Sequence, residues 1–110
     1  MLDLKFIRDN PDVVRRAMRA KMLGESEPKL DQLLMTDEEL RIVRRDLEAL
    51  QAERNASSKL VGEMKRRGEN DAALMDRLAA VSDDVKRLED KARSLQQQLD
   101  GLLLEIPNLP

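Results

Sequence analysis

The sequence contains no cysteine, no histidine and a single aromatic residue, Phe6. Without cysteine the chain can form neither disulfides nor thiolate metal sites, and without histidine it lacks the commonest metal ligand and general base. We therefore expect no catalytic residue, no cofactor-binding residue and no metal ligand in this chain. Because 38% of the residues are charged and 1% are aromatic, long exposed helices are favoured over a compact core.

Long hydrophobic runs are also missing. The first ten residues carry charge throughout and contain no apolar segment of the kind found in signal peptides. No run approaches the length of a transmembrane helix. We therefore expect a cytoplasmic protein with no membrane partner.

A heptad repeat fills the last third of the chain. Apolar residues recur there at alternating spacings of four and three, with no polar residue at any of the ten positions. These positions are Leu74, Leu78, Val81, Val85, Leu88, Ala92, Leu95, Leu99, Leu102 and Ile106. A stripe with a period of 3.5 is too narrow for a globular core and packs against another long helix in a left-handed supercoil. The chain must therefore supply a partner helix.

Residues 28–67 are the expected partner, because their apolar residues follow the same spacing. These residues are Leu33, Leu40, Val43, Leu47, Leu50, Val61 and Met64. Thr36 and Glu39 could form a capping box that starts a new helix. The heptad phase passes through Thr36 without a slip, however, so one continuous helix is favoured.

Gly68, Glu69 and Asn70 interrupt the pattern and predict a tip turn at 68–70, followed by a second long helix at 71–105. A short loop forces the helices antiparallel, and about 34 residues make an arm on the order of 50 Å long. Two registers place a positions opposite d positions. Facing residue numbers sum to 135 in one (Leu47 with Leu88) and to 142 in the other (Leu47 with Leu95), and the sequence does not decide between them.

The first 27 residues predict a small helical base. Asp3 can cap a short first helix, and Asn10, Pro11 and Asp12 form a typical start for a second. Leu30 and Leu34 lie off the heptad seam. They are the expected docking points for Phe6, Ile7 and the Val14 side of the base.

The predicted fold class is therefore all-α: a long antiparallel two-helix coiled coil, or helical hairpin arm, with a small amino-terminal helical cap. Residues 1–110 form one domain in this prediction. It consists of the base (1–27), the first long helix (28–67), the tip turn (68–70), the second long helix (71–105) and the start of a linker (106–110), which we expect to lead to a missing domain.

Basic residues gather near the expected tip. Residues 54–67 contain five basic residues and one acidic residue, whereas the other 96 residues contain 15 and 21. Lysine and arginine on a rigid outer face bind nucleic-acid backbone by charge and counterion release. Without aromatic residues to stack on unpaired bases, shape readout of double-helical RNA fits better. A merely solvated coiled-coil face is the alternative interpretation.

The seam is interrupted at Arg54 and Ser57. Two compatible interpretations are that this pair sets the register, with Arg54 extending out of the seam, and that the helices are looser there for a purpose. Next to the interruption, four residues occupy b and f positions that face away from the partner helix: Asn55, Lys59, Gly62 and Arg66. Glycine inside a helix costs roughly 1 kcal/mol relative to alanine. Gly62 is thus either a tolerated surface residue or a place where a ligand backbone comes close.

Three segments resemble the amino-terminal arm of bacterial-type seryl-tRNA synthetases. They are Met1–Pro11, the stretch Leu50–Asn55 with Ser58 and Lys59, and Leu102–Pro110. They stand in the family's order and spacing, and the resemblance covers essentially all 110 residues.

The resemblance implies an antiparallel coiled coil that projects from a class II catalytic domain. Such an arm lies along the long variable arm and elbow of serine tRNA and carries the acceptor end to the other subunit of a homodimer. The parent enzyme would activate serine with ATP and magnesium before esterifying the tRNA. Because the class II motifs are absent here, we expect the ATP, magnesium and serine sites beyond Pro110 and no activity in this chain alone.

The residues expected to bind tRNA fall into two groups. Those that match the family's arm motif are Arg54, Asn55, Ser58 and Lys59. Those that rest on local charge are Lys65, Arg66, Arg67 and Arg77. Serine tRNA is the expected partner, together with homodimerisation through the missing domain and no DNA. The alternatives are a structural or scaffolding coiled coil that does not bind RNA, and the arm of a synthetase-like paralogue.

Overall fold

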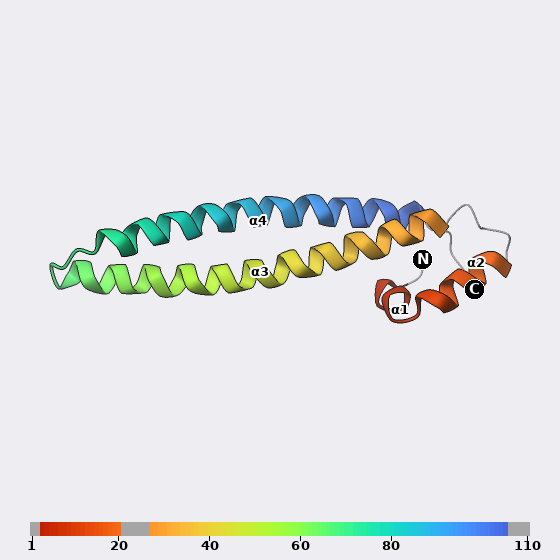
Figure 1. Cartoon of the computed structure of the whole chain (residues 1–110), viewed down its shortest axis with the longest axis horizontal. Coiled ribbons are helices and arrows are strands. Elements are labelled where there is room, and N and C mark those ends of the chain that lie inside the picture. The colour runs from red at the N-terminus through yellow and green to blue at the C-terminus, as the bar shows by residue number, and fades with distance from the viewer. Residues whose placement is uncertain (1–2, 21–26, 106–110) are drawn as a thin grey trace. The chain divides into compact units, whose positions relative to one another are not determined.

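The computed structural model describes residues 3–20 and 27–105, and all regular elements in them are helices (Figure 1). These are α1 (Leu4–Asp9), α2 (Pro11–Ala20), α3 (Glu27–Arg66) and α4 (Ala72–Glu105). The predicted all-α fold, with two long helices packed against each other, is confirmed. The expected linker at 106–110, and residues 1–2 and 21–26 of the expected base, lie outside the described residues.

Helix α3 is continuous through Thr36, so no new helix starts at that residue. It begins one residue before the predicted range and ends one residue before its predicted end, and α4 begins one residue later than predicted. The chain divides into two compact units. The first unit comprises Met1–Leu40 and Ser94–Pro110, and the second comprises Arg41–Arg93.

Local hydrogen bonds fix the short helices of the first unit. The Asp3 side chain accepts a hydrogen bond of 3.2 Å from the Lys5 N–H, which caps α1. Pro11 occupies the first position of α2, where its missing N–H costs nothing. Asn10 closes α1 instead of capping α2 with its side chain, because its Nδ2 donates to the Phe6 carbonyl at 3.2 Å.

The core of the first unit lies where the base meets the long helices. Its buried apolar residues are Ile7, Val14, Met18, Leu30, Leu33, Leu40, Leu95, Leu99 and Leu102. Ile7, Val14 and Leu30 are thus buried as expected, whereas Leu34 is half-buried. Phe6 remains 44% exposed and is not part of this core. It lies about 100° around α1 from Ile7, and a six-residue helix buries one face.

Arg8 of α1 and Asp37 of α3 form a paired ionic contact in the first unit. Arg8 Nε donates to Asp37 Oδ2 and Nη2 donates to Oδ1, both at 2.7 Å. The Asp37 side chain is 4% exposed and that of Arg8 is 33% exposed. The hydrogen bond to Asp37 raises the pKa of Arg8, so the guanidinium stays charged over the ordinary pH range.

Two exposed ion pairs join α2 to the start of α3. Arg15 pairs with Asp31, and Arg19 Nε donates to Glu27 Oε1 at 2.6 Å. This hydrogen bond to Glu27 raises the pKa of Arg19. Because both pairs face solvent, they orient α2 more than they stabilise it.

In the second unit, α3 and α4 run antiparallel (Figure 1). Val43, Val81, Val85 and Leu88 are buried in the seam. The other apolar seam residues are half-buried: Leu47, Leu50, Val61, Met64, Leu74 and Leu78. The four nearest the turn, Val61, Met64, Leu74 and Leu78, are all in this group, so the seam is less buried at the turn.

Ion pairs across the two long helices decide the register. In the second unit, Arg77 Nη2 lies 2.6 Å from Glu53 Oε1. In the register whose facing residue numbers sum to 135, Arg77 lies about 7.5 Å along α4 from the residue that faces Glu53. In the register with a sum of 142, that distance is about 18 Å. In the first unit, Lys29 Nζ lies 3.5 Å from Glu105 Oε2, and these residue numbers sum to nearly 135. The structure thus has the first of the two predicted registers.

The tip turn is closed by capping at both helix ends. Gly68 has a φ of 73°, and the N–H groups of Gly68 and Glu69 donate to the carbonyls of Lys65 and Met64 at 3.1 and 2.9 Å. This is a Schellman motif, which requires a left-handed residue after the helix. Asp71 Oδ1 then accepts from the Leu74 N–H at 3.1 Å and caps α4. The turn is therefore held by its own backbone.

Candidate nucleic-acid interface

Five of the eight residues predicted to bind tRNA lie on one side of α3 in the second unit. They occupy b, e and f heptad positions, which form a continuous surface away from the seam and which we call the outer face of α3. These residues are Asn55, Ser58, Lys59, Lys65 and Arg66, and all five are exposed. Helical periodicity, not any loop, places them together.

The basic side chains of this surface have no carboxylate partner. Lys59 and Lys65 form no ion pair with any residue in the described ranges. Arg66 Nε donates at 3.4 Å to the Gly62 carbonyl of its own helix, a long and weak hydrogen bond. The charges of Lys59, Lys65 and Arg66, which we call the tip cluster, can therefore be neutralised by an external anion.

Arg67 and Arg77 do not belong to this surface. Arg67 Nη2 lies 3.4 Å from Glu69 Oε2, and Arg77 donates to Glu53 from two nitrogens. Arg67 follows Arg66 by about 100° around the helix, which turns it to the opposite edge. Charge counting along the sequence therefore grouped residues that the helix separates.

Arg54 lies in the seam, where its side chain is half-buried. It has no ion pair or side-chain hydrogen bond with a described residue, and in the described part of the chain no buried side-chain N or O atom lacks a partner. Its guanidinium therefore reaches solvent while its stem covers the seam. This favours the interpretation that Arg54 extends out of the coiled coil.

Gly62 is open to solvent at the place where a side chain would begin. A Cβ atom built on Gly62 meets no atom within 4 Å, and the same is true of Gly101 on α4. Packing therefore does not require glycine at either position. Gly62 differs from Gly101 in lying among the residues of the outer face.

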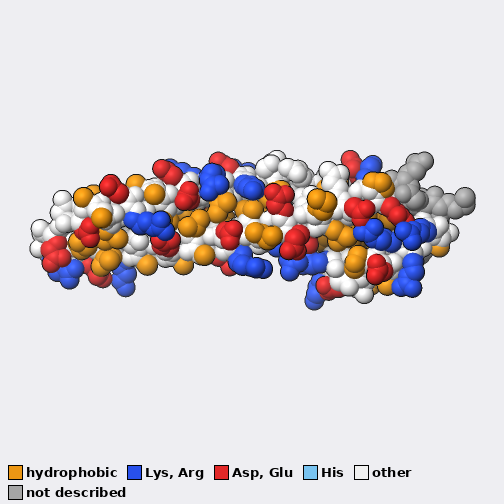
Figure 2. All heavy atoms as spheres, viewed as in Figure 1, with side chains coloured by type: hydrophobic (Ala, Val, Ile, Leu, Met, Phe, Trp, Pro, Cys, Tyr) orange, Lys and Arg blue, Asp and Glu red, His pale blue; other side chains and the backbone are white. Residues whose placement is uncertain are grey.

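Three aspartates line the outer edge of α4 in the second unit. Asp76, Asp83 and Asp90 recur every seven residues on α4, at f positions that face away from α3, and all three are exposed. We call them the acidic ridge. Basic and acidic side chains are interspersed over the face shown in Figure 2.

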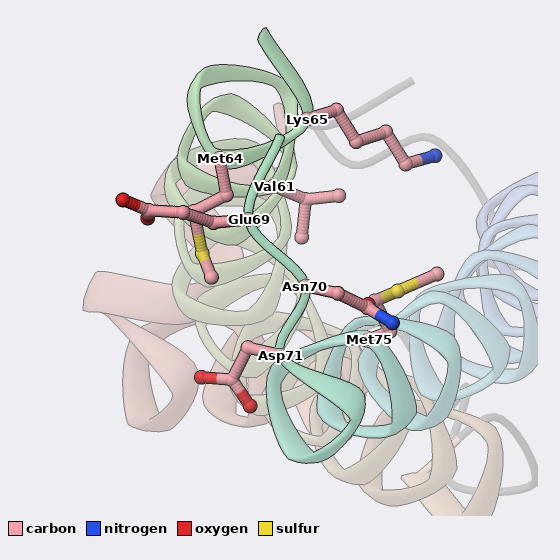
Figure 3. Close-up of a pocket in the computed structure, with 7 residues that line it drawn as sticks. All are labelled: Val61, Met64, Lys65, Glu69, Asn70, Asp71 and Met75. Atoms are coloured by element: carbon pink, nitrogen blue, oxygen red, sulfur yellow. The ribbon is translucent and has the colours of Figure 1, made fainter. Parts of the chain in front are cut away.

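The tip carries a shallow hollow between the end of α3 and the start of α4 (Figure 3). Its cavity volume is about 10 Å³, far below the roughly 300 Å³ at which small-molecule pockets begin. Lys65 extends away from Glu69 and Asp71 in this view. The tip thus offers a charged surface better suited to a large partner than to a small ligand.

Residues 3–20 and 27–105 contain no cluster of three or more histidine, cysteine, aspartate or glutamate side chains that could hold a metal ion. Within the same ranges, none of the helices is both long and apolar enough to cross a membrane.

Comparison with known proteins identifies the family. The whole chain, residues 1–110, matches the family model described as the Seryl-tRNA synthetase N-terminal domain. The chain belongs to this family. The family resemblance inferred from the three sequence segments is therefore confirmed.

Relatives in this family match the chain from end to end. Serine–tRNA ligases of Symbiobacterium thermophilum and Deinococcus radiodurans are 41% and 44% identical over 110 residues, covering 100% of this chain and 25% of each relative. The crystal structure of seryl-tRNA synthetase from Pyrococcus horikoshii complexed with ATP matches with a TM-score of 0.87 and 28% identity. That match covers 99% of this chain and 24% of the other. The chain thus spans about a quarter of the length of these relatives.

Proposed function

We propose that this chain is the tRNA-binding arm of a seryl-tRNA synthetase. In this proposal it recognises the long variable arm and elbow of serine tRNA through backbone and shape contacts, and positions the tRNA for serylation. The observation that carries the proposal is the outer face of α3, where three exposed cations without carboxylate partners share one surface with Asn55 and Ser58. Family membership supports tRNA as the partner.

The chemistry of the surface matches double-helical RNA. Lysine and arginine side chains neutralise phosphates, and small polar side chains can hydrogen-bond to 2′-hydroxyl groups. No aromatic side chain lies on the outer face to stack on an unpaired base. Recognition by backbone and shape is therefore favoured over reading of single-stranded bases.

The parent protein would be a class II serine–tRNA ligase. It would use ATP and magnesium in a catalytic domain beyond this chain, dimerise through that domain and act in the cytoplasm. The 110-residue chain would bind tRNA without aminoacylating it, and we propose neither a DNA nor a membrane partner.

Binding of serine tRNA by K59Q/R66Q tests the proposal. Each lost phosphate contact lowers the slope of log affinity against log salt by about one. Between 50 and 200 mM salt, the variant should therefore lose roughly twelvefold less affinity than the unmodified chain. R87Q/R93Q is the matched control, since it removes two basic residues from α4 that pair with Asp84 and Asp90.

An unchanged salt slope in K59Q/R66Q would contradict the proposal. A second arm compares serine tRNA with a tRNA that has a short variable arm. Equal and weak binding to both would instead favour a structural coiled coil without RNA binding.

A further inference from the structure

The outer face of α3 continues on the amino-terminal side of Asn55. Arg41, Arg44 and Arg45 occupy its b, e and f positions at the other end of the second unit, and all three are exposed. We call them the base-side cluster. Arg45 precedes Lys59 by 14 residues, two full heptads, so the two side chains leave α3 on the same side.

The two basic clusters are separated by a nearly uncharged stretch of the same surface. Between them the outer face carries Gln51, Ala52, Asn55 and Ser58, with Glu48 as its single acidic residue. At 1.5 Å per residue, Arg45 and Lys59 lie about 21 Å apart along the helix, and Arg41 and Arg66 lie about 38 Å apart. The surface thus has two positive ends and a polar middle.

We propose that the base-side cluster is a second phosphate-binding site, so that one RNA double helix is held at two points along α3. This inference rests on the proposed function, which needs only the tip cluster. Proteins that bind double-helical RNA contact phosphates on both sides of a minor groove and 2′-hydroxyls within it. Basic clusters flanking a row of amide and hydroxyl side chains reproduce that order along one rigid helix.

The state of Arg45 supports the assignment. Its side chain forms no ion pair with Glu48 or with any other residue in the part of the chain that the structure describes. Arg41 and Arg44 do have interaction partners in the chain, so Arg45 is the member of the cluster whose charge a bound phosphate would neutralise.

Within the second unit, three of the four acidic residues of α3 lie on its other edge. Asp46 and Glu53 occupy g positions and Glu63 a c position, away from the outer face. A polyanion approaching the outer face therefore meets cations at both ends and a single carboxylate between them. An acidic protein segment would be attracted by the same charges, but the polar middle with its hydroxyl and amide groups favours RNA.

The test measures binding of two RNA hairpins to the chain and to R41Q/R45Q. The probes are a stem of about 16 base pairs, the span contacted by double-stranded RNA-binding domains, and a stem about a third as long. For the long stem, the salt slope should fall by about two in R41Q/R45Q, equivalent to roughly twelvefold between 50 and 200 mM salt. The short stem cannot reach both clusters, so the substitution should weaken its binding less.

The two proposals fail in different ways. If K59Q/R66Q lowers the salt slope and R41Q/R45Q does not, the second phosphate site is wrong and the proposed function stands. If neither variant changes the slope, both are wrong. Equal effects of R41Q/R45Q on the long and the short stem would overturn the two-point arrangement. Circular dichroism of each variant verifies that the helices are intact, and R87Q/R93Q again serves as the control.

Discussion

Replacing Arg8 with methionine should loosen α1 from α3. Methionine keeps most of the aliphatic stem but removes both 2.7 Å hydrogen bonds to Asp37. The carboxylate of Asp37, which is 4% exposed, would then be a buried charge without a partner. The substitution therefore tests whether this pair holds the base in place.

The cost follows from the burial of the two partners. Removing one member of a fully buried ion pair costs about 3–5 kcal/mol. Because Arg8 is 33% exposed, water can reach the carboxylate from that side, and we expect about 2–3 kcal/mol. At about 1.4 kcal/mol per factor of ten, the opening equilibrium of α1 should rise roughly 30- to 150-fold.

Amide hydrogen exchange measures this opening directly. The Ile7 and Asn10 N–H groups donate to the Asp3 and Phe6 carbonyls at 3.1 and 2.9 Å and report on α1. The Met75 N–H, in the second unit, provides an internal reference. Exchange at Ile7 and Asn10 within twofold of the unmodified chain would refute the reasoning.

R15M is the matched control. It also removes an ion pair between the base and α3, but its partner Asp31 is 52% exposed. A solvent-exposed pair contributes about 0.2–1 kcal/mol, so exchange should rise less than about fivefold. Equal effects of R8M and R15M would show that burial does not set the strength of these contacts.

Three further substitutions test the second unit. G62A should raise the free energy of unfolding by roughly 1 kcal/mol and weaken the binding of serine tRNA. G101A should stabilise the chain in the same way without changing tRNA binding. Identical tRNA binding by both variants would make Gly62 an ordinary surface residue. G68A should lower the free energy of unfolding in urea by about 1–2 kcal/mol, because a residue with a Cβ is disfavoured at a φ of 73°. Unchanged stability would show that the left-handed conformation at position 68 does not require glycine. Replacing the acidic ridge with asparagines should raise affinity for every tRNA and reduce discrimination between long and short variable arms; preserved discrimination in filter binding would contradict a repulsive role.

The helices could be predicted from the sequence because heptad spacing and capping are local. Ten apolar positions in one phase predict α4, and Gly68 with Asp71 predicts the turn. The register could not be predicted, since both alternatives pair a with d positions. It depends on how many residues the turn removes from the helices, and Glu53 with Arg77 reports the result.

The contacts of the base and part of the candidate site could not be predicted from the sequence either. Arg8 and Asp37 are separated by 29 residues, and neither lies in a motif that marks it as buried. A count of charge in one continuous window of sequence does not reveal the base-side cluster. Counting charge by heptad position would have found Arg41, Arg44 and Arg45 on the same face as Lys59.

The uneven charge of the second unit has a kinetic consequence. The outer face of α3 carries six basic residues and one acidic residue in this unit, whereas α4 carries five of each between residues 72 and 93, so the unit has a transverse electric dipole. A polyanion at a distance of about one Debye length, roughly 10 Å in 0.1 M salt, would exert a torque that turns the outer face toward it before contact. Orientation would then be selected during the encounter. Substitutions in the acidic ridge should consequently change the association rate constant more than the dissociation rate constant.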